Sequence, residues 1–322
     1  MGRPRPSLMP GSLVRDFTHP DLFGEAFRAR DVTITFERVG SFHGSVMRTE
    51  LNTVWLQRGF ANTARTSRAT LTDRVHFAFV AGPGAAQVWN GRVISDQEFF
   101  CQIGTDGLFI RNQGTGTWGS VSFLPDDLAR AAIAVAGFDP QRLRAASRIA
   151  TRDLAASGRL RRRHRAIEQV TRRTPHVFAA PAVIRQFNDQ ITRLLLDCLP
   201  GCPPDPDRAS TRRHHLIMRR FAGWLAARPG DPVTLTELCA GIGANARTLN
   251  LCCQEYLGMS PIHYLRLRRL QMANKALRDA VPGIDRVTDI ALRHGFSELG
   301  RFAWAYHRMF GETPSVTLAR GV

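Results

Sequence analysis

Two short stretches of this sequence, 245–257 and 297–310, bring arginine, amide, hydroxyl and carboxylate side chains together at helical spacing. Arginine can donate two parallel hydrogen bonds to the edge of a guanine, and asparagine or glutamine can pair with adenine in the same way. Hydrogen bonding to base edges is therefore the chemistry that these residue types support. To perform it, the side chains must lie on exposed helix faces.

The first stretch, "NARTLNLCCQEYLG", has apolar residues on one side of a helix and polar residues on the other. Its buried stripe is predicted to be Leu249, Cys252 or Cys253, Tyr256 and Leu257. The candidates for base contacts are Asn245, Arg247, Asn250, Leu251 and Gln254. Asn245 can also cap the helix, and an exposed Leu251 suits the methyl group of thymine.

The second stretch, "SELGRFAWAYHRMF", is rich in aromatic side chains. Phe302, Tyr306 and Phe310 recur at four-residue intervals and predict a buried stripe. The candidates for DNA contact are Ser297, Glu298, Arg301, Trp304 and Arg308. For each of them the alternative is a solvated side chain or a phosphate contact, and Trp304 could instead pack on a neighbouring helix.

Metal-dependent catalysis is a competing interpretation that the spacing does not support. A metal-binding cluster would need a pair such as His-x-His with further ligands nearby, and no such pair occurs. The candidate ligands are isolated or wrongly spaced for a structural zinc finger: His43, Glu50 and His76, then Cys198, Cys202, His214 and His215. We expect no catalytic residue, no metal and no cofactor.

Each of the two stretches follows a shorter helix and a glycine-containing turn, so 234–257 and 287–310 are predicted to be repeated helix-turn-helix units. Thr234 and Glu237 predict a capping box at the start of the first unit. The helix between the units, capped by Ser260, spans about 20 residues, or roughly 30 Å. One DNA turn is roughly 34 Å, so both units could enter successive major grooves.

The region 210–322 resembles the DNA-binding domain of AraC/XylS-type transcription regulators through "LTELCAGIGANARTL", "EYLGMSPIHYLRLRRLQMANKAL" and "VTDIALRHGFSELGRFAWAYHRMFGETPS". Leu251 and Cys253 depart from the family pattern, which leaves the base preference of the first unit open. The resemblance implies a sequence-specific regulator that binds double-stranded promoter DNA and contacts RNA polymerase. We expect an activator; a repressor and an architectural DNA-binding protein without sequence choice are the alternatives.

The distribution of charge agrees with a polyanionic partner for the second half of the chain. The net charge is +17; residues 1–127 hold 13 basic and 12 acidic side chains, whereas residues 128–322 hold 31 and 15. Such an excess attracts nucleic acid. On the helix between the two units, the predicted phosphate contacts are Arg266, Arg268 and Arg269. The basic run 158–165 is predicted to be a solvated linker, or a contact to DNA or an acidic partner.

Between residues 30 and 125, short β-branched and aromatic runs alternate with glycine and asparagine turns, which predicts an antiparallel sandwich or barrel. Asn90 and Gly91 suit a type I′ hairpin turn. This texture is similar to the cupin-like sensing domain of the same family. That resemblance implies an antiparallel β-barrel with a pocket for a small-molecule effector, followed by helices that form a homodimer.

We therefore expect an α+β chain with five parts. These are a disordered lead-in (1–15), a β-rich effector-sensing domain (16–127), a helical extension with the basic run (128–200), a linker (201–209) and a DNA-binding domain (210–322). The helix 182–199 could mediate dimerisation, although its apolar stripe also fits a core. The cysteines lack a disulfide framework and no long apolar run exists, so we expect a cytoplasmic protein without membrane contact.

Overall fold

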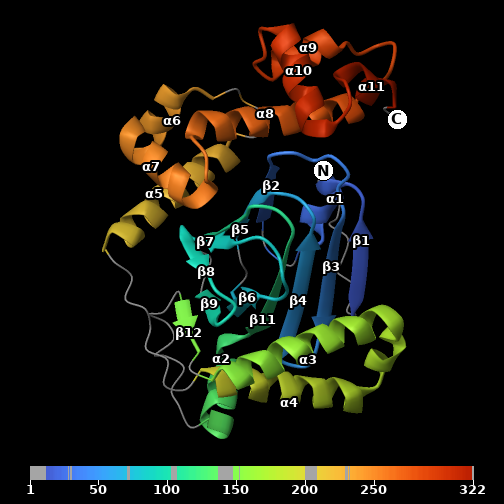
Figure 1. Ribbon diagram of the computed structural model, residues 1–322, viewed down its shortest axis with the longest axis vertical. Helices are drawn as coiled ribbons and strands as arrows, with labels where there is room; N and C mark the ends of the chain where they lie inside the picture. The colour runs from blue at the N-terminus through green and yellow to red at the C-terminus, as the bar shows by residue number, and fades with distance from the viewer. Residues whose placement is uncertain are drawn as a thin grey trace, which may run out of the picture.

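The structure, a computed structural model, describes residues 12–27, 29, 31–70, 73–102, 107–136, 148–151, 153–199, 209–228, 231 and 233–320. A β-rich part is followed by a helical part, which lies along one end of the β strands (Figure 1). Among the described helices, none combines the length and the apolar character needed to cross a bilayer.

The larger sheet has seven strands, and every neighbouring pair in it is antiparallel. In spatial order they are β1 (Leu13–Phe17), β3 (Gly44–Glu50), β4 (Val54–Ala61), β11 (Gly116–Phe123), β6 (Val75–Val80), β9 (Glu98–Gln102) and β12 (Arg148–Ala150). Strand β1 therefore begins inside the stretch that was expected to be a disordered lead-in; residues 1–11 of that stretch lie outside the described residues.

The smaller sheet has five antiparallel strands. In spatial order they are β2 (Asp31–Phe36), β5 (Arg65–Thr70), β10 (Gly107–Asn112), β7 (Gln87–Trp89) and β8 (Arg92–Ile94). Between β7 and β8, Asn90 and Gly91 both have positive φ, 46° and 80°, which confirms the predicted hairpin turn.

The expectation of a closed barrel is wrong. The described strands form two separate sheets, and each sheet keeps two unpaired edges: β1 and β12 in the larger, β2 and β8 in the smaller. The sequence pattern of short alternating strands is common to sandwiches and barrels, because both bury one face of each strand. Pattern alone therefore does not decide whether the edges meet.

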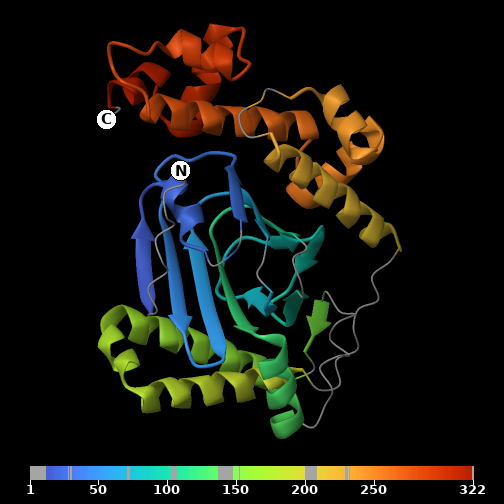
Figure 2. The same cartoon turned by 180° about the vertical axis from the view of Figure 1, so that it is seen from behind.

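Helices pack against the larger sheet, near the end of its strands that lies away from α8 (Pro261–Arg278) (Figure 2). They are α3 (Leu154–Arg173) and α4 (Pro181–Cys198), joined by the 3-10 helix Pro175–Ala179 and preceded by α2 (Pro125–Ala131) and a π-helical turn (Ala132–Ala136). Ile191 and Leu195 of α4 and Leu160 of α3 share one buried cluster with sheet residues such as Phe77. The stripe on α4 is therefore largely core, as its alternative interpretation held.

The basic run 158–165 is part of α3 and is not a linker. Leu160 and His164 from this run are fully buried against the sheet. Arg161 donates to the carbonyl of Val80 and stacks over the rings of Phe79 and Phe99. The linker interpretation is wrong because every third or fourth residue of the run packs inward. The many arginines between these residues hide the helical spacing in the sequence.

The second half of the chain is helical. Its helices are α5 (Ala209–Ala226), α6 (Leu235–Ile242), α7 (Ala246–Leu257), α8 (Pro261–Arg278), α9 (Val287–Arg293), α10 (Leu299–Phe310) and α11 (Pro314–Ala319). The linker expected at 201–209 lies almost wholly outside the described residues. Near the amino terminus, the short helix α1 (Pro20–Glu25) sits between the β part and α8.

Candidate nucleic-acid interface

The first helix-turn-helix unit is formed by α6 and α7. Thr234 and Glu237 make the predicted capping box, and α6 ends at Gly243, which has a φ of 65°. The Asn245 side chain accepts a hydrogen bond from the Thr248 amide at 2.8 Å and so starts α7. Inside α6, Gly241 lies against the indole of Trp224, where a Cβ would be 1.9 Å from the ring nitrogen.

The second unit repeats this construction with α9 and α10. Gly295, with a φ of 76°, occupies the turn between the two helices. In both units the recognition helix then ends at a left-handed glycine, Gly258 or Gly311, followed by a hydroxyl N-cap. Ser260 caps α8 in the first unit and Thr313 caps α11 in the second. Two copies of one local design therefore hold the two recognition helices.

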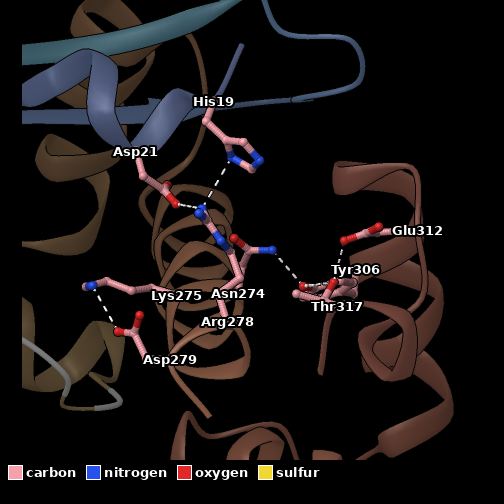
Figure 3. Close-up of polar contacts among 9 residues, drawn as sticks. All are labelled: His19, Asp21, Asn274, Lys275, Arg278, Asp279, Tyr306, Glu312 and Thr317. Atoms are coloured by element: carbon pink, nitrogen blue, oxygen red, sulfur yellow. Dashed lines mark hydrogen bonds and ion pairs between the residues drawn. The ribbon is translucent and has the colours of Figure 1, made fainter. Parts of the chain in front are cut away.

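A buried chain of hydrogen bonds ties the second unit to α8 (Figure 3). The Asn274 amide donates to the Tyr306 hydroxyl at 2.6 Å, and Tyr306 donates to the Thr317 hydroxyl at 2.8 Å. Thr317 in turn donates to the Glu312 carboxylate at 2.7 Å. Burial raises the pKa of Tyr306, so the phenol stays a neutral donor at physiological pH. This chain fixes the orientation of α10 on α8.

Helix α7 buries the stripe that its sequence predicts. Leu249, Cys252, Cys253, Tyr256 and Leu257 are buried. The five candidates for base contact lie on the exposed side of the unit: Asn245, Arg247, Asn250, Leu251 and Gln254. Burial also raises the pKa of the Cys252 thiol to about 11, which leaves it unreactive.

Helix α10 has the same two-sided character. Phe302 and Tyr306 are buried and Phe310 is partly buried against the same core. The exposed candidates are Ser297, Glu298, Arg301, Trp304 and Arg308. Glu298 and Arg301 form an exposed ion pair at 2.9 Å, and the Arg308 guanidinium lies 5.3 Å from the Trp304 ring centre. Trp304 is 60% exposed, and it borders a hollow that it shares with α8 and with Glu37 and Arg38.

The three arginines of α8 have different surroundings. Arg268 donates to the carbonyls of Leu225 and Arg228, each at 3.0 Å, so it holds the end of α5. Arg269 donates to the carbonyl of Gly295 and stacks on Phe296, so it holds the turn of the second unit. Burial lowers the pKa of both guanidiniums. These contacts give Arg268 and Arg269 a structural role that sequence reasoning missed, whereas Arg266 borders the hollow beside Trp304.

Both recognition helices touch the β-rich part near their carboxyl ends. The ring of Tyr256 on α7 meets Phe109 of β10 edge-on at 5.6 Å between centres. The carbonyl of Met309 on α10 accepts a hydrogen bond from the Val39 amide at 2.8 Å. The amino-terminal halves of both helices, which carry Arg247 and Arg301, lie away from these contacts.

Helix α8 also rests on the β-rich part. The Gln271 amide donates to the carbonyl of Ile34 in β2 at 3.2 Å. Arg278 contacts the carboxylate of Asp21 and the ring of His19 (Figure 3). These contacts join residues more than 200 positions apart, and no local motif could have predicted them.

A cavity with room of about 70 Å³ for water-sized groups lies between the two sheets of the β-rich part. The strands β2, β5 and β10 contribute every second residue to its wall, as inward-facing positions of a strand must.

The described part of the chain has no cluster of metal ligands: no three histidine, cysteine, aspartate or glutamate side chains there could hold one metal ion together.

Comparisons with known proteins agree with the helical architecture. Residues 238–320 match a family model described as a helix-turn-helix domain. The chain is 37% identical over 102 residues to the "Probable thc operon regulatory protein" of Rhodococcus erythropolis, covering 32% of this chain and 31% of the relative. It is 34% identical over 87 residues to the "XylDLEGF operon transcriptional activator 2" of Pseudomonas putida, covering 27% of this chain and 55% of the relative.

A solved structure of a probable AraC family transcriptional regulator from Rhodopseudomonas palustris is 40% identical, with a TM-score of 0.29. The alignment covers 32% of this chain and 95% of that one. The chain thus spans about a third and about half of the length of the two curated relatives above, while it covers nearly all of this shorter structure.

Proposed function

Because the chain belongs to the AraC/XylS family of DNA-binding transcription regulators, we propose that it binds promoter DNA sequence-specifically and activates transcription in the cytoplasm. The family is one of regulators and not of enzymes. In this proposal α7 and α10 enter successive major grooves, and their exposed side chains read base edges.

The observation that carries the proposal is the shared construction of the two units on α8. Helix α8 has 18 residues, which corresponds to about 27 Å, near the roughly 34 Å of one DNA turn. Each recognition helix buries an apolar stripe and exposes an arginine near its start, Arg247 in α7 and Arg301 in α10. An architectural protein that binds without sequence choice would use the same arginine and amide side chains for phosphate contacts, so the two functions differ in whether binding depends on base sequence.

Regulation by an effector is the second part of the proposal. Val32 and Ile34 of β2 line the cavity between the sheets, and the carbonyl of Ile34 also accepts a hydrogen bond from α8. A ligand that moves β2 would therefore change how α8 is held, and with it the relative position of the two recognition helices. RNA polymerase and a second copy of this chain are the further proposed partners; a repressor is the alternative outcome.

Footprinting the purified protein upstream of neighbouring genes would locate a binding site, and a gel shift with that site would then test specificity. We expect a labelled site to stay bound in the presence of an equal amount of unlabelled random DNA. Loss of binding to that competitor would favour the architectural alternative. A reporter fused to the site separates an activator, which raises expression, from a repressor, which lowers it.

A further inference from the structure

The cavity between the two sheets contains a buried cation. Arg65, from β5, lines the cavity and is 1% exposed. Its Nη1 donates to the carbonyl of Thr63 at 3.1 Å, whereas its Nη2 has no hydrogen-bond partner among the residues that the structure describes. Burial lowers the pKa of Arg65 to about 10, so the guanidinium still carries its charge at physiological pH.

No described counter-ion balances this charge. Among the described residues that line the cavity, none is acidic, and Arg65 is the only one that is charged at neutral pH. The histidine in the wall, His76, is neutral because burial lowers its pKa to about 4. A buried and unpaired charge is strongly destabilising, so its presence beside a cavity points to a partner that arrives from outside.

The rest of the wall defines the body of that partner. Ten of the seventeen lining residues are apolar, and they include Val32, Ile34, Phe100, and Leu108. Asn112 is paired with Arg65 in the strand register, and within the described part of the chain its side-chain oxygen accepts no hydrogen bond. The interior room of about 70 Å³ for water-sized groups favours a compact hydrocarbon body.

We infer that this cavity binds an apolar organic acid, whose carboxylate pairs with Arg65 and whose hydrocarbon body fills the space between the sheets. The inference rests on the proposed function, because it names the chemical class of the proposed effector. Arginine suits this role because its planar guanidinium can donate two parallel hydrogen bonds to a carboxylate. A polar sugar would leave many hydroxyl groups unpaired against the apolar wall.

The test uses two probe pairs of different shape, each made of an acid and its neutral amide: 2-naphthoate with 2-naphthamide, and octanoate with octanamide. Binding to the full chain is measured by calorimetry. We expect at least one acid to bind about tenfold more tightly than its amide, the ratio that one charge-assisted contact supplies. Equal affinity for acid and amide in both pairs, or no binding by any probe, would overturn the inference.

Two arginine variants locate the preference. Arg65→Met should bring acid and amide within about twofold of each other, since methionine keeps the length but removes the charge. Arg68→Met removes an arginine from the same strand that pairs with Asp31 and does not line the cavity. It should keep the tenfold preference. A preference that survives in Arg65→Met would place the anion site elsewhere.

Melting of the unliganded proteins separates a ligand site from a structural role for Arg65. A ligand site predicts that Arg65→Met melts at the same or a higher temperature than the wild type, because an unpaired buried charge is gone. A lower melting temperature would assign Arg65 to the fold and would count against the inference. The gel shift of the unliganded protein tests the proposed function independently, because it requires no probe.

Discussion

The arginines of the DNA-binding part differ in what their guanidinium groups touch. Arg268 and Arg269 donate to backbone carbonyls inside the protein. Among the described residues, Arg301 forms an ion pair with the neighbouring, exposed Glu298, and Arg247 is exposed near the start of α7. An exposed ion pair contributes about 0–1 kcal/mol to stability. Arg301 can therefore leave Glu298 and bind a base with little loss of stability.

We predict that Arg247→Ala and Arg301→Ala each lose sequence discrimination. The binding free energy to the correct site differs from that to a site with one altered base. Each lost base contact should reduce this difference by about 1–3 kcal/mol. Titrating each variant against both sites by fluorescence anisotropy at fixed salt measures this difference. The control is Arg185→Ala on α4, an exposed arginine outside the DNA-binding helices, which removes the same charge.

A uniform weakening on all sequences would show that the mutated arginine contacts phosphate and not a base. In that case the slope of log affinity against log salt should also fall by about one. If Arg185→Ala lowers discrimination as much as the other two, the effect comes from net charge alone.

At the scale of elements, the sequence predicted features that depend on neighbouring residues, and it did not predict contacts between distant elements. The caps at Thr234 and Asn245 and the buried stripe of α7 follow from residues within four positions of each other, and the structure has them as predicted. The basic run in α3 was misread because its inward residues make sense only against the sheet. Gly241 contacts Trp224 across two helices, and apart from the glycine itself nothing in the sequence pattern predicts this contact.

We predict opposite effects of alanine at two helical glycines. Gly241→Ala should destabilise the protein by about 1–3 kcal/mol, because its methyl group would overlap the Trp224 ring. Gly223→Ala, in the last turn of α5 with no atom of the described residues within 4 Å of the added Cβ, should stabilise it by about 0.5–1 kcal/mol. Thermal unfolding of both variants measures the difference. Equal effects would mean that α5 and α6 do not pack as closely as described.

For the whole molecule, one apolar core runs through both halves. Phe36 and Phe109 of the smaller sheet belong to the same buried cluster as Tyr256 and Leu267 of the DNA-binding helices. The sequence predicted the two kinds of structure and the helix-turn-helix repeat from composition and pattern. It could not predict that the DNA-binding helices pack on the smaller sheet, or that the sheet edges stay open. Both features depend on pairs of residues far apart in the chain.

Phe109 is the residue through which this docking is best tested. It points out of the smaller sheet, is 2% exposed, and meets Tyr256 of α7 edge-on. Truncation of a buried phenylalanine costs about 3–5 kcal/mol, and here the loss falls on the contact between the two halves. We predict that Phe109→Ala lets the halves separate, so that the radius of gyration rises and the single melting transition splits into two.

Small-angle scattering and calorimetry of the full chain measure these two quantities. Val93→Ala, an exposed residue of β8 in the same sheet, is the matched control and should change neither. A single transition and an unchanged radius in Phe109→Ala would mean that other contacts hold the halves together. If separation is observed, an effector's influence on DNA affinity should vanish in the same variant, because α8 would no longer be held against β2.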